Sequence, residues 1–153
     1  MITLPDELQP ELCNCSALRQ AARHGTQFYD RYLLPAGLRT TQFAILAKLV
    51  RLGPSTINTL AERMVMDRTT LGRNIQPLER EGLIVTRPGE HDRRSKELHL
   101  TPAGESRLRT AMKAWAHAQE QFEATFGKKR ASDMRLMMRD VAASDLGVAA
   151  SAQ

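Results

Sequence analysis

The chain has 153 residues, of which 42% are hydrophobic and 25% charged, which suits a single globular domain with one core. It has no apolar run long enough to cross a bilayer, and its first ten residues lack the basic-then-apolar pattern of a signal peptide. We therefore expect a cytoplasmic protein that does not bind membranes. The net charge of +5 permits nucleic-acid binding. The basic excess is spread evenly along the chain, however, so charge alone does not locate a binding surface.

Two helices are predicted in the first third of the chain. From about residue 12 to residue 33 apolar residues recur at helical spacing, and Pro35 and Gly37 end this segment. Thr40 or Thr41 is then expected to cap a second helix, which Gly53 ends. The predicted inward face of the second helix consists of Phe43, Leu46, Ala47 and Val50.

Residues 56–82 have the pattern of two short helices joined by a tight turn, which predicts a helix-turn-helix. Thr56 is the expected N-cap of the first helix, Asp67 that of the second, and Gly82 the residue just after its end. Pro77 is expected to bend the second helix without breaking it. Its predicted buried face consists of Leu71, Ile75 and Leu78.

The opposite face of the second helix is polar and predicts DNA recognition. Hydroxyl, amide and guanidinium groups reach base edges and phosphates, although an ordinary amphipathic surface helix has the same pattern. We expect base contacts from four residues and phosphate contacts from two others. The four are Thr69, Thr70, Arg73 and Gln76; the two are Arg68 and Asn74.

The period changes from helical to strand-like after Gly82. Residues 83–87 and 96–101 are predicted strands, and the charged residues 88–95 form the loop between them. A β-hairpin placed directly after a recognition helix is a wing. The hairpin is therefore predicted to complete a winged helix-turn-helix.

Two more helices are predicted after the wing. Thr101 and Pro102 provide an N-cap and a first helical residue for a long helix that Gly127 ends. The basic run 128–130 is expected to be a solvated turn before a last helix with a methionine-rich stripe. The apolar stripes of the first and last helices are more than a small central lobe can cover, which favours a helical dimer interface.

The predicted fold class is therefore mainly α (α+β). It is a winged helix-turn-helix with a two-stranded wing, flanked by N- and C-terminal helices that form a dimerisation lobe. We expect one domain over residues 1–153. Within it, about 12–34 and 102–146 form the helical dimerisation lobe and about 38–101 the DNA-binding lobe.

The chain resembles the MarR family of transcriptional regulators from about residue 12 to residue 146. The likeness lies in residues 59–64 (TLAERM), 66–71 (MDRTTL) and 78–84 (LEREGLI), and in the wing, with Asp92-Arg93-Arg94 followed by 98–104 (LHLTPAG). The resemblance implies a homodimeric repressor or activator that binds a palindromic operator on double-stranded DNA. It also implies release by a small ligand or an oxidant.

The same resemblance implies roles for three residues of the wing. The family motif Asp-x-Arg is matched by Asp92 and Arg94, which implies that Arg94 enters the minor groove and that Asp92 holds it in place. An extended guanidinium suits a narrow, strongly negative groove. Arg93 is expected to contact a phosphate. The alternative is a solvated charged loop without a DNA contact.

Two kinds of effector remain open. Family effectors, often small aromatic or phenolic acids, bind between the lobes, which makes Arg19, His24, Tyr29 and Trp115 ligand candidates here, although each also suits a core or interface role. The branch of the family that senses organic hydroperoxides has a reactive cysteine near the start of its first helix and tyrosines that hydrogen-bond to it. Cys15 and Tyr29 match that pattern and Cys13 is a local partner, but Arg19 and Thr40 stand where that branch has tyrosines.

Other functions fit the residues less well. No metal cluster, phosphate loop or nucleophile–base pair is visible, so we expect no cofactor, no metal and no enzyme activity. A non-specific nucleic-acid-binding or architectural protein would need a more lysine-rich, concentrated charge. A winged helix used only for protein contacts also remains open.

Overall fold

The structure is a computed structural model that describes residues 10–146, so the segment searched for a signal peptide lies largely outside it. The helices are α1 (Asn14–Leu33), α2 (Thr40–Leu52), α3 (Ile57–Met64), α4 (Arg68–Arg80), α5 (Pro102–Phe126) and α6 (Lys128–Ala143). Two short 3-10 helices are η2 (Pro10–Leu12) and η3 (Leu34–Ala36), and the strands are β1 (Ser55–Thr56), β2 (Ile84–Pro88) and β3 (Lys96–Leu100). None of the described helices is long and apolar enough to span a membrane.

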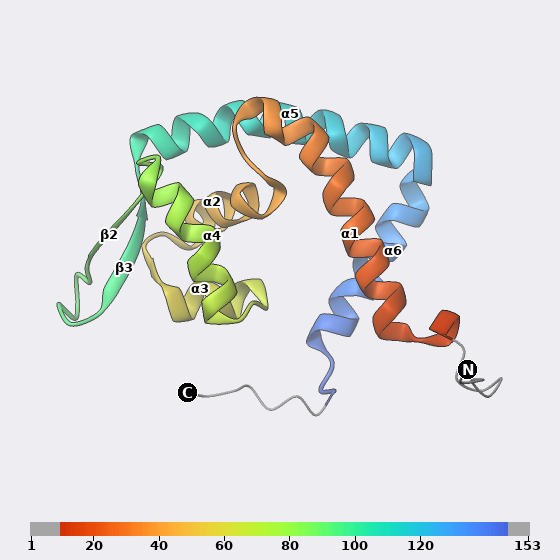
Figure 1. The fold of residues 1–153 in the computed structure, drawn as a ribbon, viewed down its shortest axis with the longest axis horizontal. Helices are drawn as coiled ribbons and strands as arrows, with labels where there is room; N and C mark the ends of the chain where they lie inside the picture. Colours follow the sequence, from red (N-terminus) through yellow and green to blue (C-terminus); the bar gives the residue numbers. More distant parts are fainter. Residues whose placement is uncertain (1–9, 147–153) are drawn as a thin grey trace, which may run out of the picture.

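The elements form two lobes joined by α5 (Figure 1). One contains α1, α6 and the second half of α5; the other contains α2, α3, α4 and the sheet. The main core lies chiefly in the second lobe, where α2, α3, α4 and β3 contribute Leu46, Leu60, Leu71 and Leu98. The predicted fold class is confirmed.

Residues close by in the sequence cap the two helices of the helix-turn-helix. Thr56 accepts a hydrogen bond from the Thr59 amide at 3.2 Å, and the Asp67 carboxylate accepts one from the Thr70 amide at 2.8 Å. At the end of α4, Gly82 has φ +69° and the Leu83 amide donates to the Leu78 carbonyl at 2.9 Å, which is a Schellman cap. The helix runs on through Pro77. The predicted caps and buried face are confirmed.

The sheet has three strands rather than the two predicted. Its order is β1-β3-β2, all antiparallel, with Ser55 opposite Leu98 and Ile84 opposite Leu100. A strand of two residues is too short to show an alternating pattern, so β1 could not be recognised in the sequence. Its pairing fixes the wing to the start of α3.

The predictions for α2 were partly wrong. Arg39 precedes its first turn, and Thr40 is its first residue, where Asp30 of α1 accepts from both the Thr40 amide and hydroxyl at 2.7 Å. Val50 is 58% exposed. Leu46 is buried as predicted and Phe43 and Ala47 pack against the core, but Ile45 and Leu49 complete the buried face in place of Val50. Gln42 caps the helix locally by accepting from the Arg39 amide at 2.9 Å, and Asp30 adds a cap from another helix, which spacing along the sequence does not reveal.

The basic run 128–130 was predicted as a solvated turn, but it is the first turn of α6. Gly127, at φ +99°, makes the corner by itself, because this conformation is open to glycine at little cost. α6 can therefore begin at Lys128.

Gly104 lies where α5 meets the turn after α4. A Cβ built at Gly104 would lie 2.1 Å from the Leu83 carbonyl oxygen and 2.6 Å from Leu100 Cδ1. Thr101 caps α5 by accepting from the Gly104 amide at 3.0 Å, and its hydroxyl donates to the Gly82 carbonyl at 2.6 Å. The absence of a side chain at Gly104 thus allows α5 to pack directly on the recognition-helix turn.

We expect Gly104→Ala to lower the free energy of unfolding by about 1–3 kcal/mol, because the backbone must move to admit a methyl group. Gly72→Ala is the matched control, since the nearest atom to its Cβ is Ile57 Cδ1 at 3.8 Å. It should raise stability by about 0.5–1 kcal/mol through helix propensity. Urea unfolding at one protein concentration measures both. Equal effects of the two substitutions would contradict the close packing at Gly104.

Candidate nucleic-acid interface

The polar face of α4 is open to solvent. Arg68, Thr69, Thr70, Arg73 and Gln76 are all exposed, while Leu71, Ile75 and Leu78 on the other side hold the helix against the core. The buried face therefore fixes which side chains a partner can meet. The arrangement agrees with the expected outer face of a recognition helix.

Asn74 differs from the other predicted contact residues. It is half-buried, and its amide nitrogen donates to the Thr70 carbonyl of its own helix at 2.8 Å. One of its two donor protons is thus already engaged. Asp67, at the start of α4, is exposed, and its hydrogen bonds to Thr70 lower the pKa of its carboxyl group. The cap stays ionised at neutral pH, which favours the first turn of the helix.

The loop of the wing is ordered by Asp92. Its carboxylate accepts from the Arg94 amide at 2.9 Å, and its carbonyl accepts from the Ser95 amide and hydroxyl at 3.0 and 2.7 Å. Gly89 closes the loop, with its amide donating to the Ser95 carbonyl at 2.9 Å. Asp92 therefore holds the backbone of Arg94, not its guanidinium.

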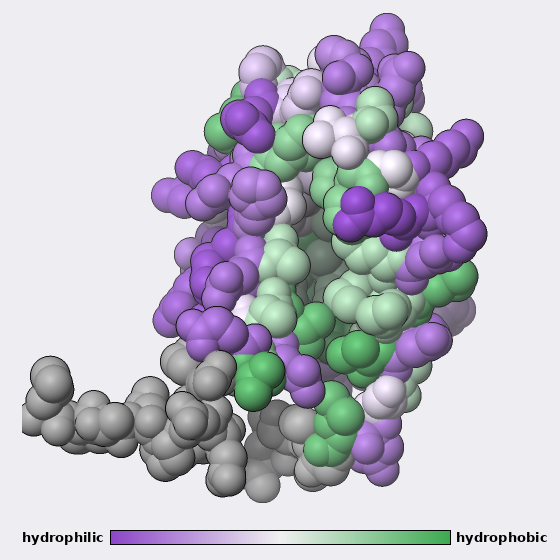
Figure 2. All heavy atoms as spheres, turned by 90° about the vertical axis from the view of Figure 1, so that its right-hand side faces the viewer, coloured by the Kyte–Doolittle hydropathy of each residue, from purple (hydrophilic) through white to green (hydrophobic). Residues whose placement is uncertain are grey.

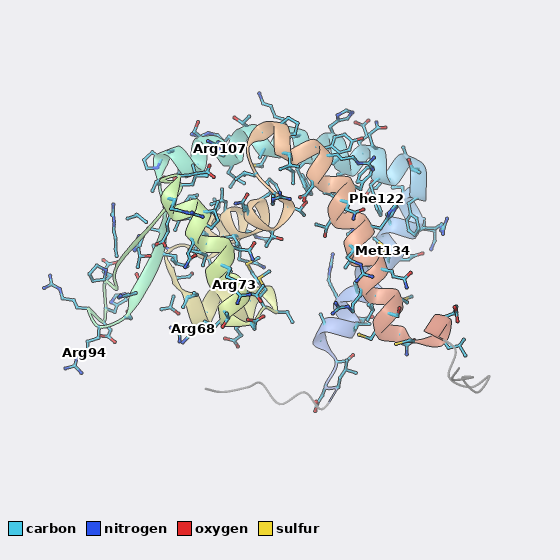
Figure 3. All side chains as sticks on the ribbon, in the orientation of Figure 1. Arg68, Arg73, Arg94, Arg107, Phe122 and Met134 are labelled. Carbon is cyan, nitrogen blue, oxygen red and sulfur yellow. The ribbon has the colours of Figure 1, made fainter. Side chains whose placement is uncertain are left out.

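The wing arginines are free to meet an anion. Arg93 and Arg94 are exposed, and neither forms an ion pair with any residue among 10–146. In Figure 3, Arg94 at the wing and Arg68 at the start of α4 lie on the same side of the lobe, the lower side in that view. The structure thus gathers unpaired cationic groups from two elements onto one surface.

The effector candidates are not gathered in one place. Arg19 and His24 are exposed on α1, whereas Trp115 of α5 stacks on Phe43 of α2 with ring centroids 6.1 Å apart. The Tyr29 hydroxyl donates to Gln119 Oε1 at 2.5 Å, and burial and the nearby Glu123 carboxylate raise its pKa. Of these four residues only His24 lines either of the two cavities described, and it does so without the other three.

The two cysteines lie at the exposed start of α1. Cys13 is its N-cap, and its sulfur accepts from the Ser16 amide at 3.4 Å. Tyr29 follows Cys15 by 14 residues on the same unbroken helix, which separates them by about 21 Å along its axis. Tyr29 therefore cannot hydrogen-bond to Cys15 of its own chain.

Sequence reasoning missed a cavity of about 500 Å³ between α2, β3 and α5. Most of its lining residues were not singled out, because they are apolar residues or single charges from three separated segments. The residues include Leu49, His99, Leu108, Arg109 and Met112. His99 Nε2 is buried there without a hydrogen-bond partner and lies 3.6 Å from Glu97 Oε2.

Comparison with known proteins identifies the family to which this architecture belongs. Residues 38–96 match the model of the MarR family. The Mycobacterium tuberculosis transcriptional regulator MosR, solved in complex with DNA, is 36% identical, with a TM-score of 0.73 over 88% of this chain and 99% of that one. YwoH of Bacillus subtilis, a helix-turn-helix-type transcriptional regulator, is 28% identical over 71% of this chain and 79% of its own length. The residues that match the family model include the helix-turn-helix, β2 and the loop of the wing, and the chain belongs to the MarR family of winged helix-turn-helix transcriptional regulators.

Proposed function

We propose that the protein is a sequence-specific DNA-binding transcriptional regulator, acting as a homodimeric repressor on a palindromic operator. The observation that carries this proposal is the shared surface of the polar α4 face and the unpaired wing arginines (Figure 3). An α-helix fits the major groove and an extended guanidinium fits a narrow minor groove. The DNA complex of the similar regulator MosR supports the same use of the fold.

Each predicted residue has a part in this proposal. Thr69, Thr70, Arg73 and Gln76 would contact base edges, because they project from the solvent side of α4. Phosphates would be met by Arg68, Arg93 and the free side of Asn74. Arg94 would enter the minor groove, with Asp92 fixing the loop from which it projects.

A homodimer would cover apolar surface that a single chain exposes. Leu18 of α1 is 37% exposed, and Leu136 and Met137 of α6 are 54% and 61% exposed. Figure 2, which faces the α1 and α6 side, shows apolar residues running through the middle of this surface between charged edges. Two chains related by a twofold axis would present two α4 helices to half-sites spaced by about 10 bp.

For release from DNA we propose either a small aromatic or phenolic acid between the lobes or oxidation at Cys15. Both thiols are exposed at the start of α1, within reach of a solvent-borne oxidant. An organic hydroperoxide would oxidise the Cys15 thiol to a sulfenic acid and leave as an alcohol. Attack by Cys13 would then expel water and form a disulfide, although so short a ring would be strained.

We expect Arg73→Ala to weaken binding to DNA from upstream of the protein's own gene by about 1–3 kcal/mol and to relax base preference at one position. Lys113→Ala on α5 removes the same charge away from the interface and is the control. Fluorescence anisotropy with a set of single-base operator variants measures both effects. Unchanged base preference would contradict the assigned face of α4.

We expect Arg94→Ala to weaken operator binding and to reduce the slope of log affinity against log salt by about one, because one contact with the anionic groove is lost. Titrations at four salt concentrations give the slope. If Arg94→Ala binds like the unchanged protein, the wing serves protein contacts instead. An affinity that never depends on sequence, in any variant, would indicate an architectural protein.

We expect Cys15→Ser to bind operator DNA normally and to remain bound after treatment with an organic hydroperoxide, which should release the unchanged protein. Cys13→Ser is the companion variant, in which Cys15 can be oxidised but cannot form the disulfide. Release of Cys15→Ser by peroxide would contradict the role of this thiol. Release by aromatic acids alone would make the effector a ligand.

A further inference from the structure

One guanidinium joins three parts of the chain. Arg107, in the second turn of α5, donates from Nη1 to the Gly37 carbonyl at 3.1 Å and lies 3.3 Å from Glu81 Oε2. Gly37 is in the turn before α2, and Glu81 is the C-cap of α4. Arg107 therefore connects the long helix that runs into the helical lobe with both the start of the winged lobe and the end of the recognition helix.

The backbone at Gly37 is adapted to this contact. Gly37 has φ +81°, and a Cβ at this position would lie 2.5 Å from Arg107 Nη1. Any side chain at residue 37 would displace the guanidinium. The close approach of the guanidinium thus depends on the glycine, although here a side chain would displace the end of an arginine, whereas at Gly104 it would meet backbone.

Arg107 lies away from the candidate DNA surface. In Figure 3 it is on the upper side of the lobe, near the end of α4, whereas Arg68 and Arg94 lie on the lower side. α4 has 13 residues, so its two ends are about 18 Å apart. The nearby Glu81 carboxylate also balances the charge of Arg107. A phosphate contact is therefore not what this side chain provides.

The position of the contact makes it a pivot for α4. A helix is a stiff rod, so a rotation of about 5° at one end moves the other end by about 1.6 Å over 18 Å. Base contacts need positions held to within about 0.5 Å. Thr101 and Gly104 fix the location of the turn after α4. Arg107 adds a second attachment point at the same end of α4, through Glu81, while Leu71, Ile75 and Leu78 hold the rest of the helix against the core.

We propose that Arg107 is a positioning residue for DNA recognition, which holds the C-terminal end of α4 in place against α5. The proposal rests on the proposed function as a DNA-binding regulator. Arg107 and Glu81 have side chains 35% and 48% exposed, and such a pair adds little to folding stability. The pair acts on the orientation of α4, so its loss should change the affinity for operator DNA more than the free energy of unfolding.

The test is Arg107→Met, which keeps the aliphatic stem but removes both polar contacts. Arg109→Met is the matched control: it removes the same charge two residues away, from a side chain that is 70% exposed and, among residues 10–146, pairs only with Glu105 of its own helix. We expect Arg107→Met to bind operator DNA about three- to tenfold more weakly, with unchanged binding to shuffled DNA and an unchanged salt slope. Arg109→Met should bind as the unchanged protein does.

Glu81→Gln and Arg107→Lys complete the test. The double variant Arg107→Met/Glu81→Gln should lose less binding free energy than the two single variants lose in sum, because both substitutions break the same Arg107–Glu81 contact. Arg107→Lys, which can still reach Glu81, should recover part of the affinity, and it replaces Arg107→Met if that variant does not fold.

Three results would overturn the proposal: equal losses in Arg107→Met and Arg109→Met, a salt slope reduced by about one, or full operator affinity in Arg107→Met. If the unchanged protein shows no sequence preference, the proposed function itself fails. Amide hydrogen exchange over residues 78–83 then decides the role of Arg107, since release of the α4 end should speed exchange in Arg107→Met and not in Arg109→Met.

Discussion

The hydrogen bonds between the turn after α4 and the first turn of α5 determine where the recognition helix can lie. The Leu83 carbonyl accepts from the amide and the hydroxyl of Thr101 at 3.1 and 3.2 Å, and Gly104 leaves room for that carbonyl. Leu83 itself is buried, so these groups cannot exchange their partners for water without loss. The orientation of α4 is therefore tied to α5, and through α5 to the helices expected to form the dimer.

Those features that depend on neighbours in the sequence could be predicted. Thr56, Asp67 and Thr101 each cap a helix by accepting from an amide three residues later, and Gly82 ends α4 within its own turn. The outer face of α4 followed from the same local information, because the buried positions at helical spacing leave only one side for contacts. For this reason the candidate DNA-contact residues of α4 could be named before the structure was known.

Features that depend on distant residues could not be predicted. Asp30 supplies the hydrogen bonds at the start of α2 from a different helix, and β1 is defined only by its pairing with β3. Tyr29 is bound to Gln119, 90 residues away in sequence, and Arg107 reaches Gly37 over 70. No periodic pattern encodes such pairs, because each depends on where the folded chain brings two segments together. This is also why the effector candidates chosen along α1 did not form one site.

The way in which Asp92 orders the wing has a consequence for how the protein would search DNA. Because the carboxylate holds the Arg94 backbone, the exposed guanidinium projects from an ordered loop, and it has no ion-pair partner among residues 10–146. Immobilising such a side chain costs about 1.5–2 kcal/mol of conformational entropy. Such a wing would attract DNA electrostatically from a distance. Part of the free energy of its final contact would be offset by the entropy lost when the arginine side chain is immobilised. The wing suits a role in capturing the duplex across varied flanking sequences, while discrimination between bases is left to the rigid helix beside it.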